Sequence, residues 1–89
     1  MNKKIISTAT APAAIGPYSQ AILAGDTLYC SGQIALDPVS GELVLDSIAS
    51  ETEQVMKNIV AVLTAAEMSL DNVVKCSIFI KDMNQFGAI

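Results

Sequence analysis

Three hydrogen-bonding side chains, Tyr18, Ser19 and Gln20, stand in a row after a stretch of chain that cannot be helical. The stretch, Ala11–Pro17, contains two prolines and a glycine. Proline lacks the amide hydrogen that a helix interior needs, and it disfavours helical backbone in the residue before it. The segment is therefore rigid and presents polar groups at the start of an apolar run. These residue types alone leave a structural loop and a binding loop equally open.

A second polar group follows at Ser31, Gly32 and Gln33, after another apolar run. A glycine at the end of a strand either adopts a positive φ or allows something to approach the backbone closely. A small hydroxyl beside such a glycine offers polar contacts without steric hindrance. For Ser31 the alternative interpretation is an ordinary hydroxyl at the end of a strand.

The charged residues exclude several classes of function. The chain has five lysines, no arginine and no histidine, and its net charge is −4. The lysines are spread along the chain and form no basic patch, so nucleic acid is not an expected partner. Histidine is the commonest general base and metal ligand, and its absence argues against a metal site.

The two cysteines, Cys30 and Cys76, form no CxxC motif. They leave open one disulfide or two free thiols, and their apolar surroundings favour two buried free thiols. Only Ile5 and Ile6 separate the N-terminal lysines from a small-residue stretch, which is too short for the apolar core of a signal peptide. The longest apolar run, Ile59–Leu63, is too short to cross a membrane. We therefore expect a cytoplasmic protein without a membrane segment.

The first half of the chain predicts short antiparallel strands. Lys4–Ser7 has the pattern of an edge strand, with lysines that discourage pairing with other chains. Ser19–Ala24 and Thr27–Ser31 predict a hairpin around the turn residues Gly25 and Asp26.

Ser50–Met68 has the pattern of a helix packed on a sheet. Ser50 and Glu53 have the spacing of a capping box, which satisfies free amides at a helix start. An apolar stripe at helical spacing predicts the buried face; it comprises Val55, Met56, Ile59, Val60, Val62, Leu63 and Ala66. The polar positions Gln54, Lys57 and Asn58 are expected to face water.

The remaining segments predict turns and one more strand. Asp37–Gly41 has proline and glycine at turn positions, and an irregular connection follows over Glu42–Ile48. Val73–Lys81 alternates apolar and polar residues and predicts a strand, followed by a turn at Asp82–Asn84. These elements predict a single α+β domain over residues 1–89. Hydrophobic residues make up 52% of the chain, an excess that we expect another subunit to cover.

The segments APAAIGPYSQA and SGQI together resemble the signature of the reactive intermediate deaminase (RidA/YjgF) family, and KCSIFIKDMNQF at Lys75–Phe86 supports the resemblance. The resemblance implies a chorismate-mutase-like α+β fold, a mixed sheet with helices on one face, assembled as a homotrimer with clefts between subunits. It also implies hydrolysis of reactive 2-imino and enamine acids, such as 2-aminoacrylate and 2-aminocrotonate, to 2-keto acids and ammonia. Neither a metal nor a cofactor is implied.

The resemblance places three substrate-binding positions on this chain. Tyr18 corresponds to the tyrosine that lines the cleft, and Ser31 and Gly32 correspond to the serine and glycine that meet the substrate or its carboxylate. The family's arginine and glutamate lie on C-terminal strands beyond Ile89, so the catalytic residues remain unknown and the domain is expected to be truncated. A non-catalytic module that binds small carboxylates is the alternative. The ribonuclease or translation-inhibitor roles described for some family members are disfavoured by the acidic charge.

Overall fold

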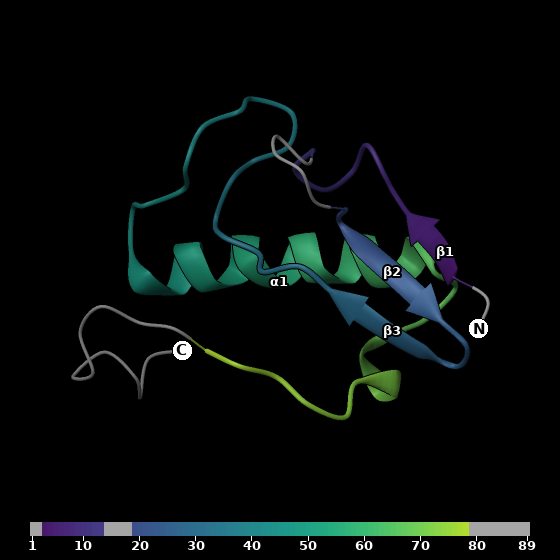
Figure 1. The fold of residues 1–89 in the computed structure, drawn as a ribbon. Coiled ribbons are helices and arrows are strands. Elements are labelled where there is room, and N and C mark those ends of the chain that lie inside the picture. The colour runs from purple at the N-terminus through teal and green to yellow at the C-terminus, as the bar shows by residue number, and fades with distance from the viewer. Residues whose placement is uncertain (1–2, 14–18, 79–89) are drawn as a thin grey trace.

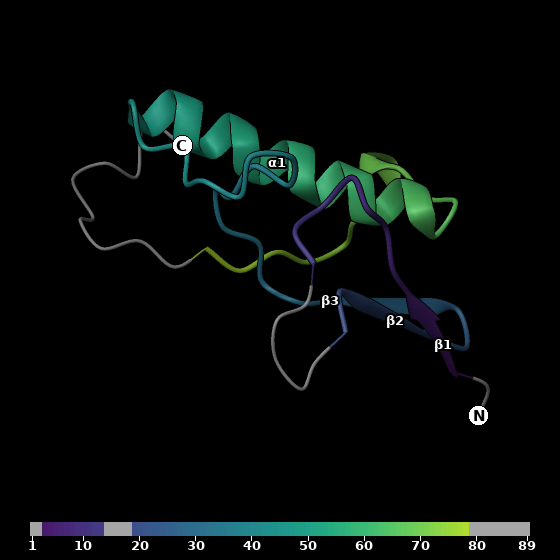
Figure 2. The same ribbon diagram turned by 90° about the horizontal axis from the view of Figure 1, so that it is seen from above.

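The computed structural model describes residues 3–13 and 19–78, which form one sheet and one long helix (Figure 1). The sheet contains β1 (Lys3–Ile6), β2 (Ala21–Ala24) and β3 (Thr27–Cys30), and α1 (Ile48–Ala65) lies along one of its faces (Figure 2). A short 3-10 helix, η1 (Leu70–Asn72), follows α1. The arrangement is a two-layer α+β fold.

The sheet is antiparallel in the order β1-β2-β3. The predicted hairpin is confirmed, because Ala21 pairs with Cys30 and Ala24 pairs with Thr27 around a turn whose Gly25 has φ +60°. The predicted edge strand is also confirmed, with Ile6 paired to Ala21. Each strand is only four residues long.

The core lies between the sheet and the C-terminal half of α1. Ile6 and Ala21 of the sheet, Ala11 of the following loop and Val62 of the helix are buried together. Leu23 and Leu28 pack against this cluster from the sheet, as do Ala61, Ala65 and Ala66 from the end of the helix. The opposite face of the sheet is uncovered, since Ile5 and Tyr29 are 69% and 65% exposed.

The helix begins and ends three residues or fewer before the predicted limits. Its N-cap is Ser47, not Ser50, because the Ser47 side chain accepts a hydrogen bond from the Ser50 amide at 3.0 Å. Serine suits the N-cap at either position, and Ser47 has the extended backbone that a cap requires. The helix ends at Ala65 because Glu67, with φ +60°, turns the chain out of the helical conformation.

The connection from β3 to α1 contains the predicted turn. The amide of Gly41 donates to the carbonyl of Asp37 at 2.9 Å, and the Asp37 carboxylate accepts from the amide of Val39 at 2.8 Å. A single bridge pairs Leu36 with Leu43 on either side of the turn.

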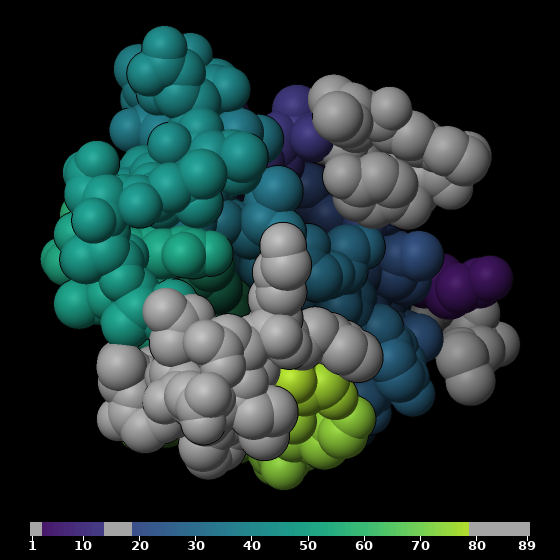
Figure 3. Space-filling view, turned by 90° about the vertical axis from the view of Figure 1, so that its left-hand side faces the viewer, coloured from purple at the N-terminus to yellow at the C-terminus, as the bar shows by residue number. Residues whose placement is uncertain are grey.

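The predicted strand at 73–81 is not observed in its described part. Residues 73–78 run stretched out past the open edge of β3, and the two segments lie side by side in Figures 1 and 3. They form no main-chain hydrogen bond to β3 or to any other described strand. The alternating pattern is compatible with a strand, but a strand also needs a paired neighbour, and Val74 is 97% exposed. Residues 79–81, and the predicted turn at 82–84, lie outside the described residues.

The prediction of buried cysteines is wrong. Cys30 and Cys76 are both free thiols, and both are exposed. Cys30 lies opposite the buried Ala21, on the core side of the sheet, but it is the last residue of β3 at the open edge. Cys76 lies in a segment that pairs with no described strand. No helix in the described part of the chain is long and apolar enough to span a membrane.

Candidate functional site

Ser31 is anchored to the segment that precedes β2. Its amide donates to the carbonyl of Gln20 at 3.0 Å, which extends the β2–β3 ladder by one bond. Its hydroxyl donates to the carbonyl of Ser19 at 2.5 Å. The two polar motifs of the sequence are therefore in direct contact, although Ser19 and Ser31 are 12 residues apart.

Gln20 organises the loop between β1 and β2. Its side chain is 4% exposed and bonds to main chain throughout. The amide oxygen accepts from the amide of Thr8 at 2.6 Å, and the amide nitrogen donates to the carbonyl oxygens of Thr8, Ala11 and Pro12. The sequence suggested that Gln20 is presented together with Tyr18 and Ser19. The side chain of Gln20 instead forms its hydrogen bonds within the protein. It fixes the backbone that leads into residues 14–18.

Asn58 holds the other end of the Ser31–Gln33 segment, and the prediction that it faces water is wrong. Its side chain is completely buried, and its amide nitrogen donates to the carbonyl oxygens of Ile34 and Leu36, both at 2.9 Å. The Asn58 side-chain oxygen accepts from Gln54 at 3.0 Å. A signal was present in the sequence, because Asn58 lies four residues before Val62 and so falls within the apolar stripe.

Gly32 lies between these two anchors and is exposed. The φ of Gly32 is not in the left-handed region, so a positive φ does not explain why this position is a glycine. A Cβ atom built at Gly32 meets no heavy atom within 4 Å in the described protein. The space beside Gly32 is therefore open to a ligand or to another subunit.

The three predicted binding positions are only partly covered by the structure. Ser31 and Gly32 are adjacent on the anchored segment, and Ser31 is half-buried. Tyr18 lies outside the described residues. Its neighbour Ser19 is the residue whose carbonyl accepts the Ser31 hydroxyl.

The thiol of Cys30, directly before Ser31, stays protonated at neutral pH. Desolvation raises its pKa above the ordinary value, and the nearby Cys76 adds a smaller contribution in the same direction. Thiolates, not thiols, are the nucleophilic form of cysteine. Cys30 therefore contributes no nucleophile to the segment.

No charged side chain of the described residues forms a hydrogen bond or an ion pair with the Ser31–Gln33 segment. Lys57 pairs with Glu53 at 3.8 Å on the exposed side of α1, and Lys75 donates to Ser77 at 2.7 Å. No group of three His, Cys, Asp or Glu side chains capable of holding a metal ion occurs among the described residues. The segment thus offers hydroxyl and main-chain groups to a ligand.

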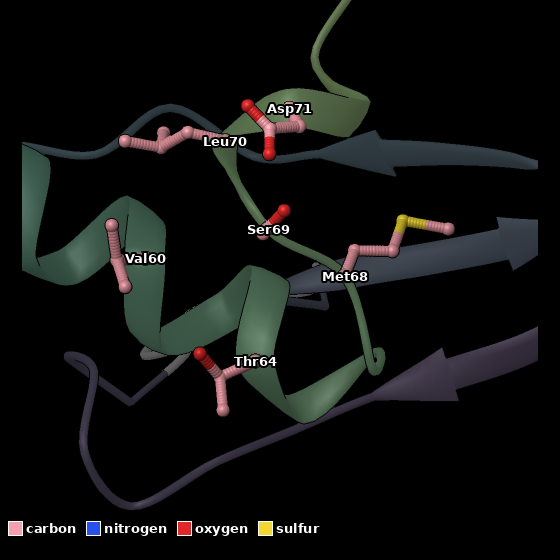
Figure 4. A pocket seen from close by; sticks show the side chains of 6 residues that line it. All are labelled: Val60, Thr64, Met68, Ser69, Leu70 and Asp71. Atoms are coloured by element: carbon pink, nitrogen blue, oxygen red, sulfur yellow. The ribbon is translucent and has the colours of Figure 1, made fainter.

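Two hollows flank the core, and only one of them adjoins the Ser31 contact. A hollow of about 290 Å³ is lined by β1, the turn after it, and Ser19 and Gln20. A second, of about 300 Å³, lies between the end of α1 and η1 (Figure 4). Its side chains do not converge on one point, since Met68 and Leu70 extend in opposite directions, and Asp71 is the only charged group in its lining. Neither Ser31 nor Gly32 lines either hollow, but the first hollow is lined by Ser19, whose carbonyl accepts the Ser31 hydroxyl, and so adjoins the candidate segment.

Comparison with known proteins identifies the family. The family model described as Endoribonuclease L-PSP matches residues 8–89. A Mus musculus protein named 2-iminobutanoate/2-iminopropanoate deaminase is 49% identical over 87 residues, which cover 98% of this chain and 64% of the mouse protein. The chain thus spans a little under two thirds of the length of this relative.

Solved structures agree with the sequence comparison. The crystal structure of YyfA, a protein of the conserved Rid family from Yersinia pestis, matches with a TM-score of 0.95 and 48% identity, covering 98% of this chain and 69% of YyfA. E. coli TdcF with bound serine matches with a TM-score of 0.89 and 37% identity, covering 94% of this chain and 65% of TdcF. The predicted YjgF-like α+β fold is therefore confirmed, and the chain belongs to the RidA/YjgF family.

Proposed function

We propose that the full-length protein hydrolyses 2-imino acids, and their enamine tautomers 2-aminoacrylate and 2-aminocrotonate, to 2-keto acids and ammonia. The observation that carries this proposal is the 49% identity, over 98% of the chain, to a protein named as a 2-iminobutanoate/2-iminopropanoate deaminase. In the reaction, water adds to the imine carbon, the carbon–nitrogen bond breaks, and the nitrogen leaves as ammonia.

The anchored segment supports this proposal. A small planar acid needs a close approach to polar groups, and Gly32 leaves space for that approach without strain in the chain itself. Ser31 donates to the main-chain carbonyls of Ser19 and Gln20. On the other side of Gly32, Asn58 donates to the carbonyls of Ile34 and Leu36, so the main chain is held on both sides and the site is preorganised for binding. The serine bound in the related TdcF structure is a small amino acid of similar size to the proposed substrates.

The proposal needs a cation for the substrate carboxylate and a group that orients the attacking water. The chain contains no arginine, and none of the described lysines forms a hydrogen bond to the Ser31–Gln33 segment. We therefore expect the arginine and glutamate of the family to act from beyond Ile89, with Tyr18 lining the same cleft. We also propose a homotrimer located in the cytoplasm, to which the two free cysteines are suited.

The test is an imine hydrolysis assay on the full-length protein. A pyridoxal-phosphate dehydratase acting on serine supplies 2-aminoacrylate, and semicarbazide traps what is not hydrolysed. We expect the protein to lower the yield of semicarbazone, Gly32→Ala to reduce this effect, and Gly32→Val to abolish it. A Cβ atom at Gly32 meets no described heavy atom within 4 Å, so Gly32→Ala should fold as the parent does. Light scattering checks that both variants assemble as the parent does.

Two outcomes would contradict the proposal. If Gly32→Val assembles normally and retains the parent rate, the segment is not the site. If the parent binds 2-keto acids but does not accelerate hydrolysis, the protein is a small-carboxylate-binding module.

A further inference from the structure

We propose that the Ser31 hydroxyl accepts a hydrogen bond from the imine nitrogen of the substrate and does not donate one to its carboxylate. The inference rests on the proposed function, because it assigns a role within the same site. It goes further by naming the atom of the substrate that Ser31 recognises.

The argument begins with the single proton of the hydroxyl. A serine hydroxyl has one O–H donor and two acceptor lone pairs. The Ser31 hydroxyl is 2.5 Å from the carbonyl oxygen of Ser19. A main-chain carbonyl can only accept, so Ser31 must be the donor in this bond. Its proton is committed, and what remains available to a ligand is acceptor capacity.

The bond to Ser19 also makes Ser31 a better acceptor. A hydroxyl that donates to a carbonyl gains electron density on its oxygen, so hydrogen bonds in a chain strengthen one another. To donate to a carboxylate instead, Ser31 would have to give up its contact with Ser19. That contact joins the two motifs that frame the segment, and Ser31 is half-buried there.

The substrate has one group of each kind. Its carboxylate has only acceptors, whereas its protonated imine nitrogen has only donors. The main-chain amides of Gly32 and Gln33 donate to no described residue and are therefore candidates to serve the carboxylate. If these amides donate to the carboxylate, the imine N–H groups remain to donate to the Ser31 oxygen.

The assignment predicts discrimination between ligands that differ only at nitrogen. Pyruvate and L-alanine share a carboxylate and a methyl group, but only alanine carries N–H donors at the position of the imine. If Ser31 accepts from nitrogen, its hydroxyl contributes to alanine binding and contributes nothing directly to pyruvate binding.

The experiment measures the dissociation constants of both ligands by calorimetry on the full-length protein. Comparisons are made among the parent, Ser31→Ala, Ser31→Thr and the exposed control Ser40→Ala. We expect Ser31→Ala to weaken alanine binding at least about tenfold, as for loss of a hydrogen bond to a charged group, relative to its effect on pyruvate. Ser31→Thr keeps a hydroxyl and should restore the parent ratio of the two constants. Ser40→Ala should leave that ratio unchanged.

The ratio of the two dissociation constants distinguishes a lost contact with the ligand nitrogen from a general disturbance of the segment. A general disturbance would weaken the binding of both ligands equally. Equal weakening of both ligands in Ser31→Ala, or failure of the parent to bind either ligand, would overturn the inference. If the ratio shifts as expected but the parent does not hydrolyse imines, the proposed function fails, and only the recognition of a ligand nitrogen by Ser31 is retained. If hydrolysis is found and the ratio does not move, the inference fails alone.

Discussion

Polar side chains fix the main chain on both sides of Gly32. Ser31 bonds to the carbonyl of Ser19 on one side, and Asn58 bonds to the carbonyls of Ile34 and Leu36 on the other. Asn58 is completely buried, so its own polar atoms have no contact with water outside these bonds. A polar group that loses its partner inside a protein costs more than the bond itself contributes, because it has already lost its contacts with water.

Asn58→Asp should destabilise the protein strongly. The change replaces the NH₂ group that serves two carbonyl oxygens with a carboxylate oxygen, which cannot donate and which repels them. We expect the free energy of unfolding to fall by at least about 2 kcal/mol, measured by urea denaturation of the full-length protein. Asn72→Asp is the matched control, since the Asn72 side chain accepts a hydrogen bond from the amide of Ser69 and an aspartate can do the same. Equal stability of the two variants would contradict the role assigned to Asn58.

The prediction of Ser31 and Gly32 as binding residues came from the resemblance of the SGQI segment to a family signature, because a hydroxyl and a glycine are equally typical of an ordinary strand end. Asn58 was missed because its partners, Ile34 and Leu36, lie 24 and 22 residues away. A polar residue on the buried side of a helix indicates a hydrogen-bond partner, but helical spacing does not say which segment supplies it.

At the scale of elements, the end of α1 is formed by a left-handed residue that is not glycine. Glu67 has φ +60°, its amide donates to the carbonyl of Thr64 at 2.9 Å, and the amide of Met68 donates to the carbonyl of Leu63 at 2.8 Å. This is the hydrogen-bond pattern of a Schellman motif, in which glycine is the usual residue at the left-handed position.

Glu67→Gly should stabilise the protein, because glycine adopts a positive φ without the steric cost that a side chain brings. Part of the gain is offset by the greater freedom of glycine in the unfolded chain. We expect a net increase in the free energy of unfolding of about 0.5–1 kcal/mol. Glu67→Ala retains the steric cost and serves as the control for loss of the carboxylate. A stabilisation by alanine as large as that by glycine would show that the charge, and not the backbone, is responsible.

The sequence predicted the type of the three strands and of the long helix better than their limits, and it did not predict η1. The hairpin and the helix follow from turn residues and from apolar spacing, which are local. The helix start was misplaced because both Ser47 and Ser50 are suitable caps, and only the extended backbone at Ser47 distinguishes them. Residues 73–78 have a strand pattern without a paired strand, because pairing depends on segments distant in the sequence.

At the scale of the whole molecule, one face of the sheet is uncovered. Ile5 and Tyr29 are 69% and 65% exposed, and Ile34, beside the candidate site, is 62% exposed. A group of large, exposed apolar side chains is typical of a surface that another protein covers. The homotrimer proposed above would bury such a face between subunits.

Light scattering on the full-length protein should therefore give three times the mass of one chain. Tyr29→Glu places a charge on the uncovered face and should shift the protein toward smaller species, whereas Val39→Glu, at a 94% exposed turn position, should not. A parent protein that remains monomeric at micromolar concentration would contradict both the trimer and a cleft between subunits.

The central claim is that the segment around Gly32 contacts the substrate carboxylate, and a ligand titration followed by NMR tests it most directly. Two-dimensional ¹H–¹⁵N spectra of the full-length protein, recorded with increasing pyruvate, report on each main-chain amide. The account predicts the largest shifts at the amides of Gly32 and Gln33, with little change at Met68 and Asp71 beside the second hollow. Shifts centred on Met68 and Asp71, with Gly32 and Gln33 unmoved at saturating pyruvate, would contradict it.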